Sequence, residues 1–474
     1  MEPPVARPPP LTVKRAWRVT RLGLAGLLGL VVLIVLATNV LIRTQLLRRL
    51  VNSKPEELVV DYRGAASWLP GRLSFDALTL RSRDRNIEFE AALSGVALRV
   101  SLVDLLRRRF HATRLRGRTL RFLLRERLAP AEATPTRLAR YPRIAGYADP
   151  PLLPTTPPPP EPAKGPWRIV IDDLEIAGVE EIWIDSWRWS GKGSVAGAFE
   201  LLPGREARVG PARLEVAQGT LRYGDSKVAE RTRGAVWCDF PRFDSLTRPG
   251  NDVWKILSGG SNLEADLGSL ALLSSDSGDP RLSGGAGSIR ERIRMRDGVG
   301  SVQVSVTARD LAVRTGKRQF RGSAQVDIEA PRVDFLQGEA SLAGTKVVLS
   351  NVSVEGDPSH PWAATISTPA ARLFFLDGSF DTQLAGDLLD ARPIAALLSP
   401  GLGKWAVNLL HLENLHLTAR LAAGPSRLAL TSVRLSAGTF SLEGDYRTSP
   451  GRERGDFHAK KGILSLRFTI PSGG

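Results

Sequence analysis

The stretch IEFEAALSGVALRV, residues 87–100, predicts the kind of fold that most of this chain adopts. Apolar side chains occupy the odd positions from 87 to 93 and the even positions from 96 to 100. Alternation with a period of two is typical of a β-strand that buries one face. The change of parity falls at Gly95, which indicates a β-bulge, because glycine tolerates the unusual backbone angles that a bulge needs.

The same alternation returns along the chain, at 302–306, 324–328, 415–421 and 464–470. A short repeat accompanies it. Val-x-Phe-x-x-Gly-x-Ala-x-Leu-x-Gly at 333–344 matches the spacing of apolar residues and glycines at 433–444, and 214–224 is a slightly shortened copy. Each copy predicts a β-hairpin, and repeated hairpins indicate an elongated sheet. Chance similarity among hairpins is the alternative. The predicted fold class is mostly β, an elongated curled antiparallel sheet with few short helices.

An uncharged run of 21 residues, Leu22 to Ile42, lies close to the N-terminus. As an α-helix it measures roughly 30 Å, the thickness of a bilayer's hydrocarbon core. We predict a retained single-pass anchor that includes Leu22, Leu33 and Ile42. The alternative is a cleaved signal peptide, but its apolar region would normally be shorter. Basic residues flank the run in almost equal numbers, and they slightly favour a cytoplasmic N-terminus with the body translocated.

The net charge of +16 is concentrated in the first part of the chain. Residues 1–127 hold 24 basic and 10 acidic residues, whereas 128–474 hold 41 and 39. An evenly basic chain would suggest nucleic acid. This distribution instead places positive charge beside the predicted anchor, where it is attracted to anionic headgroups. We predict no nucleic-acid partner, and headgroup contacts at Arg43, Arg48, Arg49, Arg107, Arg108 and Arg109. A solvated arginine-rich face, and an anionic-polymer site near 114–118, are the alternatives.

Composition divides the chain into segments. Residues 129–166 include a proline-rich run that cannot pair in a sheet, so we interpret them as a linker or an extended surface strap. Two stretches predict short helices, 102–109 and 387–410. The predicted segments are a basic cytoplasmic tail at 1–21, the transmembrane helix at 22–42, a membrane-proximal β/α start at 43–128, the linker or strap at 129–166, a β-meander at 167–257, a Gly/Ser-rich break at 258–287, and a β-rich segment with short helices at 288–474.

Residue patterns that carry chemistry are absent from the sequence. Among the histidines only His411 and His416 are close, and their spacing differs from the i, i+4 pair of a zinc-binding helix. The glycine-rich 284–288 lacks the Gly-Lys-[Ser/Thr] ending of a phosphate-binding loop. The single cysteine, Cys238, excludes a disulfide framework. We therefore predict that the protein is not an enzyme and has no cofactor or metal.

The order of elements from 43 to 128 resembles the start of AsmA-like proteins, the TamB-like periplasmic groove proteins anchored in the inner membrane. The resemblance rests on an N-terminal apolar helix followed by Trp68-Leu69-Pro70-Gly71, strands at 72–80 and 86–100, a short Leu-rich helix at 101–106, and a basic returning strand at 110–124. The segments 167–223 and 415–470 are similar to that family's long runs of meandering strands.

The resemblance implies a curled β-sheet whose apolar concave face holds the acyl chains of membrane lipids. It further implies a single-pass protein of the bacterial inner membrane, with its body in the periplasm, that contributes to phospholipid transfer. Another envelope protein or a second copy of the chain is the expected further partner. An envelope scaffold or assembly factor for outer-membrane proteins is the alternative function. On this interpretation the groove-lining residues are Val302, Val304, Val306, Leu415, Leu417 and Leu421.

Overall fold

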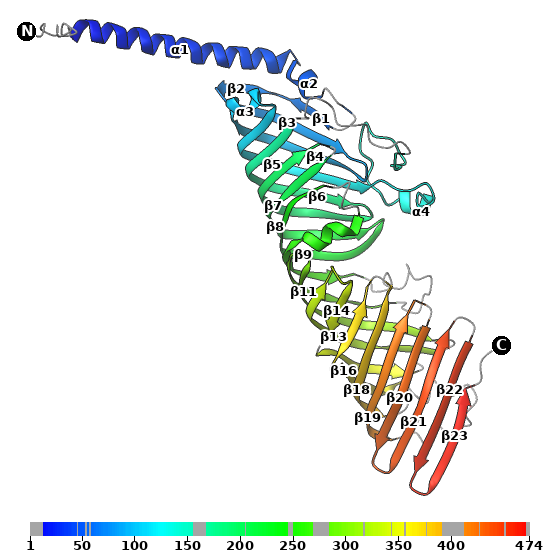
Figure 1. The fold of residues 1–474 in the computed structure, drawn as a ribbon. Coiled ribbons are helices and arrows are strands. Elements are labelled where there is room, and N and C mark those ends of the chain that lie inside the picture. The colour runs from blue at the N-terminus through cyan, green and yellow to red at the C-terminus, as the bar shows by residue number, and fades with distance from the viewer. Residues whose placement is uncertain are drawn as a thin grey trace, which may run out of the picture.

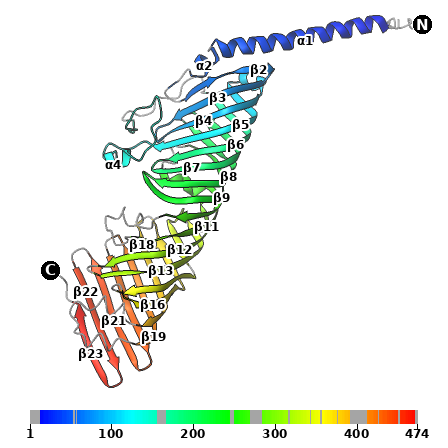
Figure 2. The ribbon, with the colours of Figure 1, turned by 180° about the vertical axis from the view of Figure 1, so that it is seen from behind.

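The computed structural model describes residues 13–44, 46–52, 55, 58–154, 167–203, 205–244, 250–268, 284–315, 318–342, 344–354, 357–375, 377–390, 412–425, 427–449 and 452–470. These residues form one long sheet of 23 strands with few helices. The sheet is elongated, twisted and curved, and the N-terminal helix projects from one end of it (Figures 1 and 2). The prediction of a mostly β, mainly antiparallel and elongated fold is confirmed.

Helix α1 (Val13–Arg43) contains the whole apolar run 22–42. Its last turns are attached to the body of the protein. The side-chain amide of Asn39 donates a hydrogen bond to the carbonyl of Ser67 at 2.7 Å and accepts one from the Ser67 N–H at 3.0 Å. Ile42 is buried beside Tyr62, and α2 (Leu46–Val51) follows. Within the described residues, no helix has the length and apolarity that a membrane crossing requires.

The first strands confirm the change of face at Gly95, which has φ +55°. Gly95 has no register partner on β3 or on β5, yet the register of both strand pairs is the same before and after it. The inward residues change parity there in all three strands, for example from Phe75 to Leu80 in β3. The irregularity is therefore shared by neighbouring strands and is not an extra residue in one of them, so the predicted β-bulge at Gly95 is wrong. The elements here are β1 (Leu58–Arg63), β2 (Ala66–Leu69), β3 (Arg72–Arg83), β4 (Ile87–Val100), α3 (Leu102–Leu106) and β5 (Arg109–Glu126).

Strands β5 and β6 (Arg168–Ile184) are parallel, the one parallel pair among the described strands. The chain must therefore return along the length of β5 before β6 begins. Residues 127–154, which we name the strap, make the first part of this return and include α4 (Pro135–Leu138). Leu128, Tyr141 and Ile144 of the strap are buried. Of the two interpretations of 129–166, the described part fits a packed strap, and residues 155–166 lie outside the described residues.

The meander continues through β7 (Trp187–Leu202), β8 (Glu206–Tyr223), β9 (Ser226–Asp244), the 3₁₀ helix η1 (Gly250–Ile256) and β10 (Ser258–Leu267). The predicted Gly/Ser-rich break at 258–287 is wrong in its first ten residues, which are strand β10, paired with β9 and β11. The glycines have a packing reason: a Cβ on Gly260 would lie 2.1 Å from the carbonyl oxygen of Ile293. Residues 269–283 lie outside the described residues.

The rest of the sheet continues from β11 to β23, and between β13 and β18 it runs through two pairs of strands, β15 with β16 and β14 with β17. Its strands are β11 (Ala286–Arg296), β12 (Val299–Thr315), β13 (Arg318–Asp334), β14 (Glu339–Leu342), β15 (Thr345–Val354), β16 (Asp357–Thr368), β17 (Ala371–Phe374), β18 (Ser379–Asp390), β19 (Glu413–Gly424), β20 (Arg427–Ala437), β21 (Phe440–Ser449), β22 (Arg452–Lys461) and β23 (Leu464–Ile470).

Two of the three predicted hairpins are present. They are β13–β14, with Gly338 at φ +71°, and β20–β21, with Gly438 at φ +55°. The third is wrong, because 214–223 belongs to the single strand β8.

The two stretches predicted to be helical beyond the anchor have different outcomes. Helix α3 confirms the first, within the predicted stretch 102–109. The first four residues of the predicted helices at 387–410 are instead the end of strand β18, where Leu388 is buried in a side-chain cluster. Pairing with β16 and β19 provides the backbone hydrogen bonds that a helix would otherwise make within itself. Residues 391–410 lie outside the described residues.

Candidate apolar groove

The inner face of strands β3 to β9 encloses an apolar cavity of about 360 Å³. Its walls are aliphatic and aromatic side chains from seven consecutive strands, among them Leu80, Phe89, Phe122, Ile171, Phe199 and Val209. Alternation explains this composition, because each strand sends every second side chain to the same face. A cavity of this size is within the range of small-molecule sites in proteins, which are mostly apolar.

Curvature of the sheet forms the cavity, which stays partly open to solvent. Leu80 of β3 and Phe89 of β4 pack around the same cluster as Leu201 of β7 and Ala207 of β8, although β5 and β6 separate these two pairs of strands. Such contacts are impossible in a flat sheet with strands about 4.8 Å apart. The N-terminal part of the sheet therefore curls until strands that are not neighbours in the ladder share side-chain contacts.

Polar residues of the cavity lie mainly at two turns. Ser82, Arg83 and Asp84 belong to the end of β3 and its turn, and Arg205 and Glu206 belong to the β7–β8 turn. The guanidinium of Arg83 lies 5.2 Å from the centre of the Tyr147 ring, which comes from the strap. Burial raises the pKa of Tyr147 to about 12, so this phenol is neutral at physiological pH. The arrangement is an apolar interior with charged residues of both signs at these two turns.

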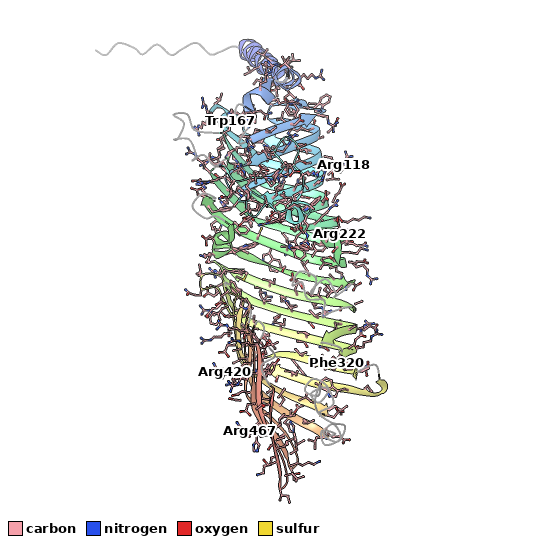
Figure 3. The ribbon with its side chains drawn as sticks, turned by 90° about the vertical axis from the view of Figure 1, so that its right-hand side faces the viewer. Arg118, Trp167, Arg222, Phe320, Arg420 and Arg467 are labelled. Atoms are coloured by element: carbon pink, nitrogen blue, oxygen red, sulfur yellow. The ribbon has the colours of Figure 1, made fainter. Side chains whose placement is uncertain are left out.

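The opposite face of the same strands carries paired charges. Arg114 bonds Asp173 at 2.9 Å, and Arg121 bonds Glu181. The pattern extends to the C-terminal strands, where Arg420 bonds Asp381 and Arg467 bonds Asp456. Figure 3 labels these two arginines on the C-terminal strands. Three of the six arginines of strand β5, Arg114, Arg116 and Arg121, are thus paired with acids of its neighbour β6. This pairing weakens the alternative of an anionic-polymer site at 114–118, since two of the three arginines there, Arg114 and Arg116, lie within 4 Å of Asp173.

A row of five aromatic rings leads from the cavity along the turns of the sheet. Ring centres are 6.2 Å apart between Phe243 and Phe240, 6.4 Å between Phe240 and Trp254, 6.5 Å between Trp254 and Phe335, and 5.3 Å between Phe335 and Phe375. Phe243 also lines the cavity. Backbone hydrogen bonds connect the turns that carry the row, for instance from the Phe335 N–H to the Gly298 carbonyl at 2.9 Å. We name these five residues the aromatic row.

The predicted groove residues lie in the other half of the sheet, away from this cavity. Val302, Val304 and Val306 are half-buried on β12, and Val302 packs against the same cluster, Ala330, Val333 and Ala340, as Phe335 of the aromatic row. Leu417 and Leu421 are half-buried on β19. Leu415 has no exposed surface, because it packs in a cluster with Trp362 and Phe457, so it is a core residue in this structure. The cavity itself was missed, although the alternation at 87–93 that forms part of its wall was visible in the sequence.

The predicted anchor and headgroup residues are placed around the N-terminal end of the sheet. Leu33 is exposed and Ile42 is buried against the body, while the side chain of Leu22 lies outside the described ones. Arg43, Arg49, Arg107 and Arg108 are exposed, and Arg109 is half-buried. Arg48 is already engaged, with Asp61 at 2.7 Å and the Tyr62 carbonyl at 2.8 Å.

In the part of the chain that the structure describes, no group of three or more His, Cys, Asp and Glu side chains is arranged to hold a metal ion. Compared with known proteins, the chain matches no protein-family model, no curated protein and no solved structure. The resemblance to AsmA-like proteins stays a prediction.

Proposed function

We propose that this protein binds the acyl chains of phospholipids in the cavity enclosed by β3 to β9. In this proposal it is anchored by residues 22–42 in a bacterial inner membrane, its body lies in the periplasm, and it contributes to phospholipid transfer or to outer-membrane lipid homeostasis. The observation that carries the proposal is the apolar cavity, which the protein's own side chains leave unfilled.

The chemistry of the cavity favours an acyl chain over a polar ligand. Polar atoms of a ligand placed between Phe122 and Phe199 would lose their hydrogen bonds to water without replacement. Each CH₂ group of an acyl chain, in contrast, gains about 0.8 kcal/mol on leaving water. The charged residues at the two turns, among them Arg83 and Glu206, suit a zwitterionic headgroup that remains in water. Binding of this kind is passive, and release requires an equally apolar destination, such as another bilayer.

Length limits what one molecule can do. The 23 strands occupy twenty successive positions, because β1 and β2 both pair with β3, β14 and β15 with β13, and β16 and β17 with β18. At about 4.8 Å between neighbouring positions the sheet is roughly 90 Å long. We infer that the protein operates with another envelope protein or with a second copy of itself if it moves lipid across the whole periplasm.

Two neighbouring alanines on β4 allow a matched test. Ala91 lines the cavity, whereas Ala92 is on the opposite face of the same strand, paired with Thr79 and Arg121. Ala91→Phe should fill part of the cavity with an apolar ring and lower the amount of phospholipid that co-purifies with the full chain. Ala92→Phe adds the same ring outside the cavity and should leave the lipid content unchanged. Mass spectrometry of the retained lipid, normalised to protein, measures both.

The proposal fails if the purified protein carries no lipid, or if the two variants lose lipid equally. Circular dichroism of both variants separates loss of binding from loss of the fold. A lipid-free wild-type protein that still folds would leave an anchored structural module.

An envelope scaffold for outer-membrane proteins is the second candidate, and the C-terminal strand favours it. Among the described strands β23 pairs only with β22, so its other edge is open for strand addition. Leu464 on this strand is 66% exposed. Photo-crosslinking from position 466 to an outer-membrane protein would support this function, and lipid content insensitive to Ala91→Phe would favour it over lipid binding.

A further inference from the structure

Five large apolar side chains are exposed at the end of the sheet next to α1. Trp68 is 82% exposed and Leu106 is 88% exposed, and Leu69, Leu102 and Val103 are exposed as well. Single exposed apolar residues are ordinary, but a group of them that includes a tryptophan indicates an interaction surface. We name these five residues the tip surface.

The tip surface is assembled from two segments that lie side by side. Trp68 and Leu69 end strand β2, and the other three residues belong to α3. The N–H of Val100, just before α3, bonds the carbonyl of Gly71 at 2.7 Å. A Cβ placed on Gly71 would lie 3.8 Å from Leu102 Cγ. Figure 1 shows β2 and α3 together at this end of the sheet, beside α1.

Arginines next to the tip surface lack enough acidic partners. Arg72 and Arg99 are register partners on β3 and β4, and Arg99 is also the register partner of Arg114 on β5. Arg114 bonds Asp173, but no acidic side chain in the described residues pairs with Arg72 or Arg99. Both line a shallow depression beside Trp68. Like charges directly opposite on neighbouring strands repel each other, so an anion bound here would relieve the repulsion.

The position of α1 identifies the surface that these residues face. Asn39 of α1 is joined by two hydrogen bonds to Ser67, the residue before Trp68. From there the helix extends away from the body, with Leu33 and Leu36 exposed (Figures 1 and 2). If residues 22–42 are in a bilayer, the last turns of α1 lie at its surface, and Trp68 lies at the same level.

We propose that the tip surface docks on the bilayer that holds α1, with Trp68, Leu69, Leu102, Val103 and Leu106 in the interfacial region and Arg72 and Arg99 on anionic headgroups. The inference rests on the proposed membrane anchoring of residues 22–42. Tryptophan is enriched at membrane interfaces because its ring is apolar and its N–H is polar. Basic residues near the surface are attracted to anionic lipids. Docking would hold one end of the sheet against the membrane, so that the long axis of the sheet has a fixed orientation relative to the bilayer.

Single labelled cysteines in the full chain test the docking. In a Cys238→Ser background, an environment-sensitive fluorophore is attached to Leu106→Cys, to Leu33→Cys or to Ile463→Cys. Ile463 is fully exposed in the turn between β22 and β23, at the far end of the sheet. The protein is reconstituted in phosphatidylcholine vesicles with or without phosphatidylglycerol, and brominated lipids serve as quenchers. We expect quenching at 33 and 106, none at 463, and stronger quenching at 106 when phosphatidylglycerol is present.

Charge is tested separately, with a second matched pair of variants. Arg72→Gln/Arg99→Gln should lower quenching at 106 several-fold in phosphatidylglycerol vesicles. The control is Arg447→Gln/Arg454→Gln, which removes two arginines that also face each other across strands, at the far end of the sheet. It should have no effect.

The outcomes separate this inference from the proposed function. Quenching at 33 without quenching at 106 overturns the docking surface and leaves the anchor intact. Quenching at 106 without quenching at 33 supports docking and overturns the anchor. Absence of quenching at both positions overturns both. The lipid content of the cavity is an independent readout that none of these results determines.

Discussion

Arg125 of β5 and Glu88 of β4 form an ion pair that is almost completely buried, with 1% and 2% of the two side chains exposed and 2.8 Å between Arg125 Nη2 and Glu88 Oε2. The same guanidinium donates hydrogen bonds to the carbonyls of Pro142 at 3.1 Å and of Ala148 at 2.7 Å. These two carbonyls belong to the strap. One arginine therefore joins two strands of the sheet to the connection that makes β5 and β6 parallel.

Arg125→Met should strongly destabilise this end of the protein. The substitution leaves the Glu88 carboxylate buried without its main partner, and removing one member of a buried pair typically costs about 3–5 kcal/mol. It also releases the strap, so residues 127–154 should become sensitive to protease. Chemical unfolding and limited proteolysis with identification of the cleavage sites measure the two effects.

The control for this prediction is Arg434→Met. Arg434 pairs with Glu443 at 3.0 Å, but both side chains are exposed, and pairs of this kind contribute about 0–1 kcal/mol. Equal destabilisation by the two substitutions would contradict the assigned role of Arg125, as would a strap that stays protease-resistant in Arg125→Met.

His111 should make the attachment of α3 dependent on pH. Its Nδ1 lies 2.7 Å from Asp104 of α3 and its Nε2 lies 2.6 Å from Asp172 of β6. Burial alone would lower the pKa of His111, and Arg109 acts in the same direction. The two carboxylates outweigh both and raise the pKa above its usual value. The hydrogen bond from His111 lowers the pKa of Asp104.

The signs of these two shifts define a pH window. A histidine whose pKa is raised on folding stabilises the protein fully below its unfolded pKa of about 6.5, and the contribution is lost as the pH rises through the folded pKa. The contribution of Asp104 is present above its unfolded pKa of about 3.9 and is lost on acidification. The difference in unfolding midpoint between wild type and His111→Gln should therefore be largest near pH 5–6 and smaller at pH 8. A difference independent of pH would contradict this assignment.

Strands were predictable from the sequence because their signal is local. The alternation at 87–100 places the change of face at Gly95, where the structure has it. The helical spacing of apolar residues wrongly predicted a helix at 387–390. These residues form a strand, because Leu388 is buried by strands that are distant in the sequence.

The cavity was not predictable, because it depends on curvature. Alternation shows that Leu80 and Leu201 each belong to an apolar face, but it does not show that the sheet curls until both pack in one cluster. It also cannot tell which apolar face is filled, so Leu415, a core residue, was assigned to the groove. The partners of the β5 arginines were equally hidden, since Arg114 and Asp173 meet only when β5 and β6 pair in parallel.

Gly219→Ala should destabilise the protein although it lies within a strand. A Cβ at this position would be 2.1 Å from Trp189 Nε1, and the Trp189 ring is buried with Val179 and Val216. Overpacking of a filled core typically costs about 1–3 kcal/mol. Gly424→Ala is the control, because a Cβ there has no neighbour within 4 Å. Thermal unfolding and near-ultraviolet circular dichroism, which reports the Trp189 environment, should change only for Gly219→Ala. A normal unfolding midpoint for Gly219→Ala would mean that the ring can move aside.

If the protein transfers lipid as proposed, Trp254→Ala should slow this transfer without emptying the cavity. Trp254 is the middle member of the aromatic row and joins Phe240 to Phe335. Its removal opens a gap between ring centres that are each about 6.5 Å from it. A lipid that leaves along the row would then expose its acyl chain to water, which raises the free-energy barrier to its release.

The control is Trp187→Ala, which removes a similarly exposed tryptophan that packs on Tyr223 outside the row. Transfer of a fluorescent phospholipid from donor to acceptor vesicles should fall for Trp254→Ala alone, while lipid retained per protein stays equal. Equal transfer by the two variants would mean that lipid leaves the cavity by another route.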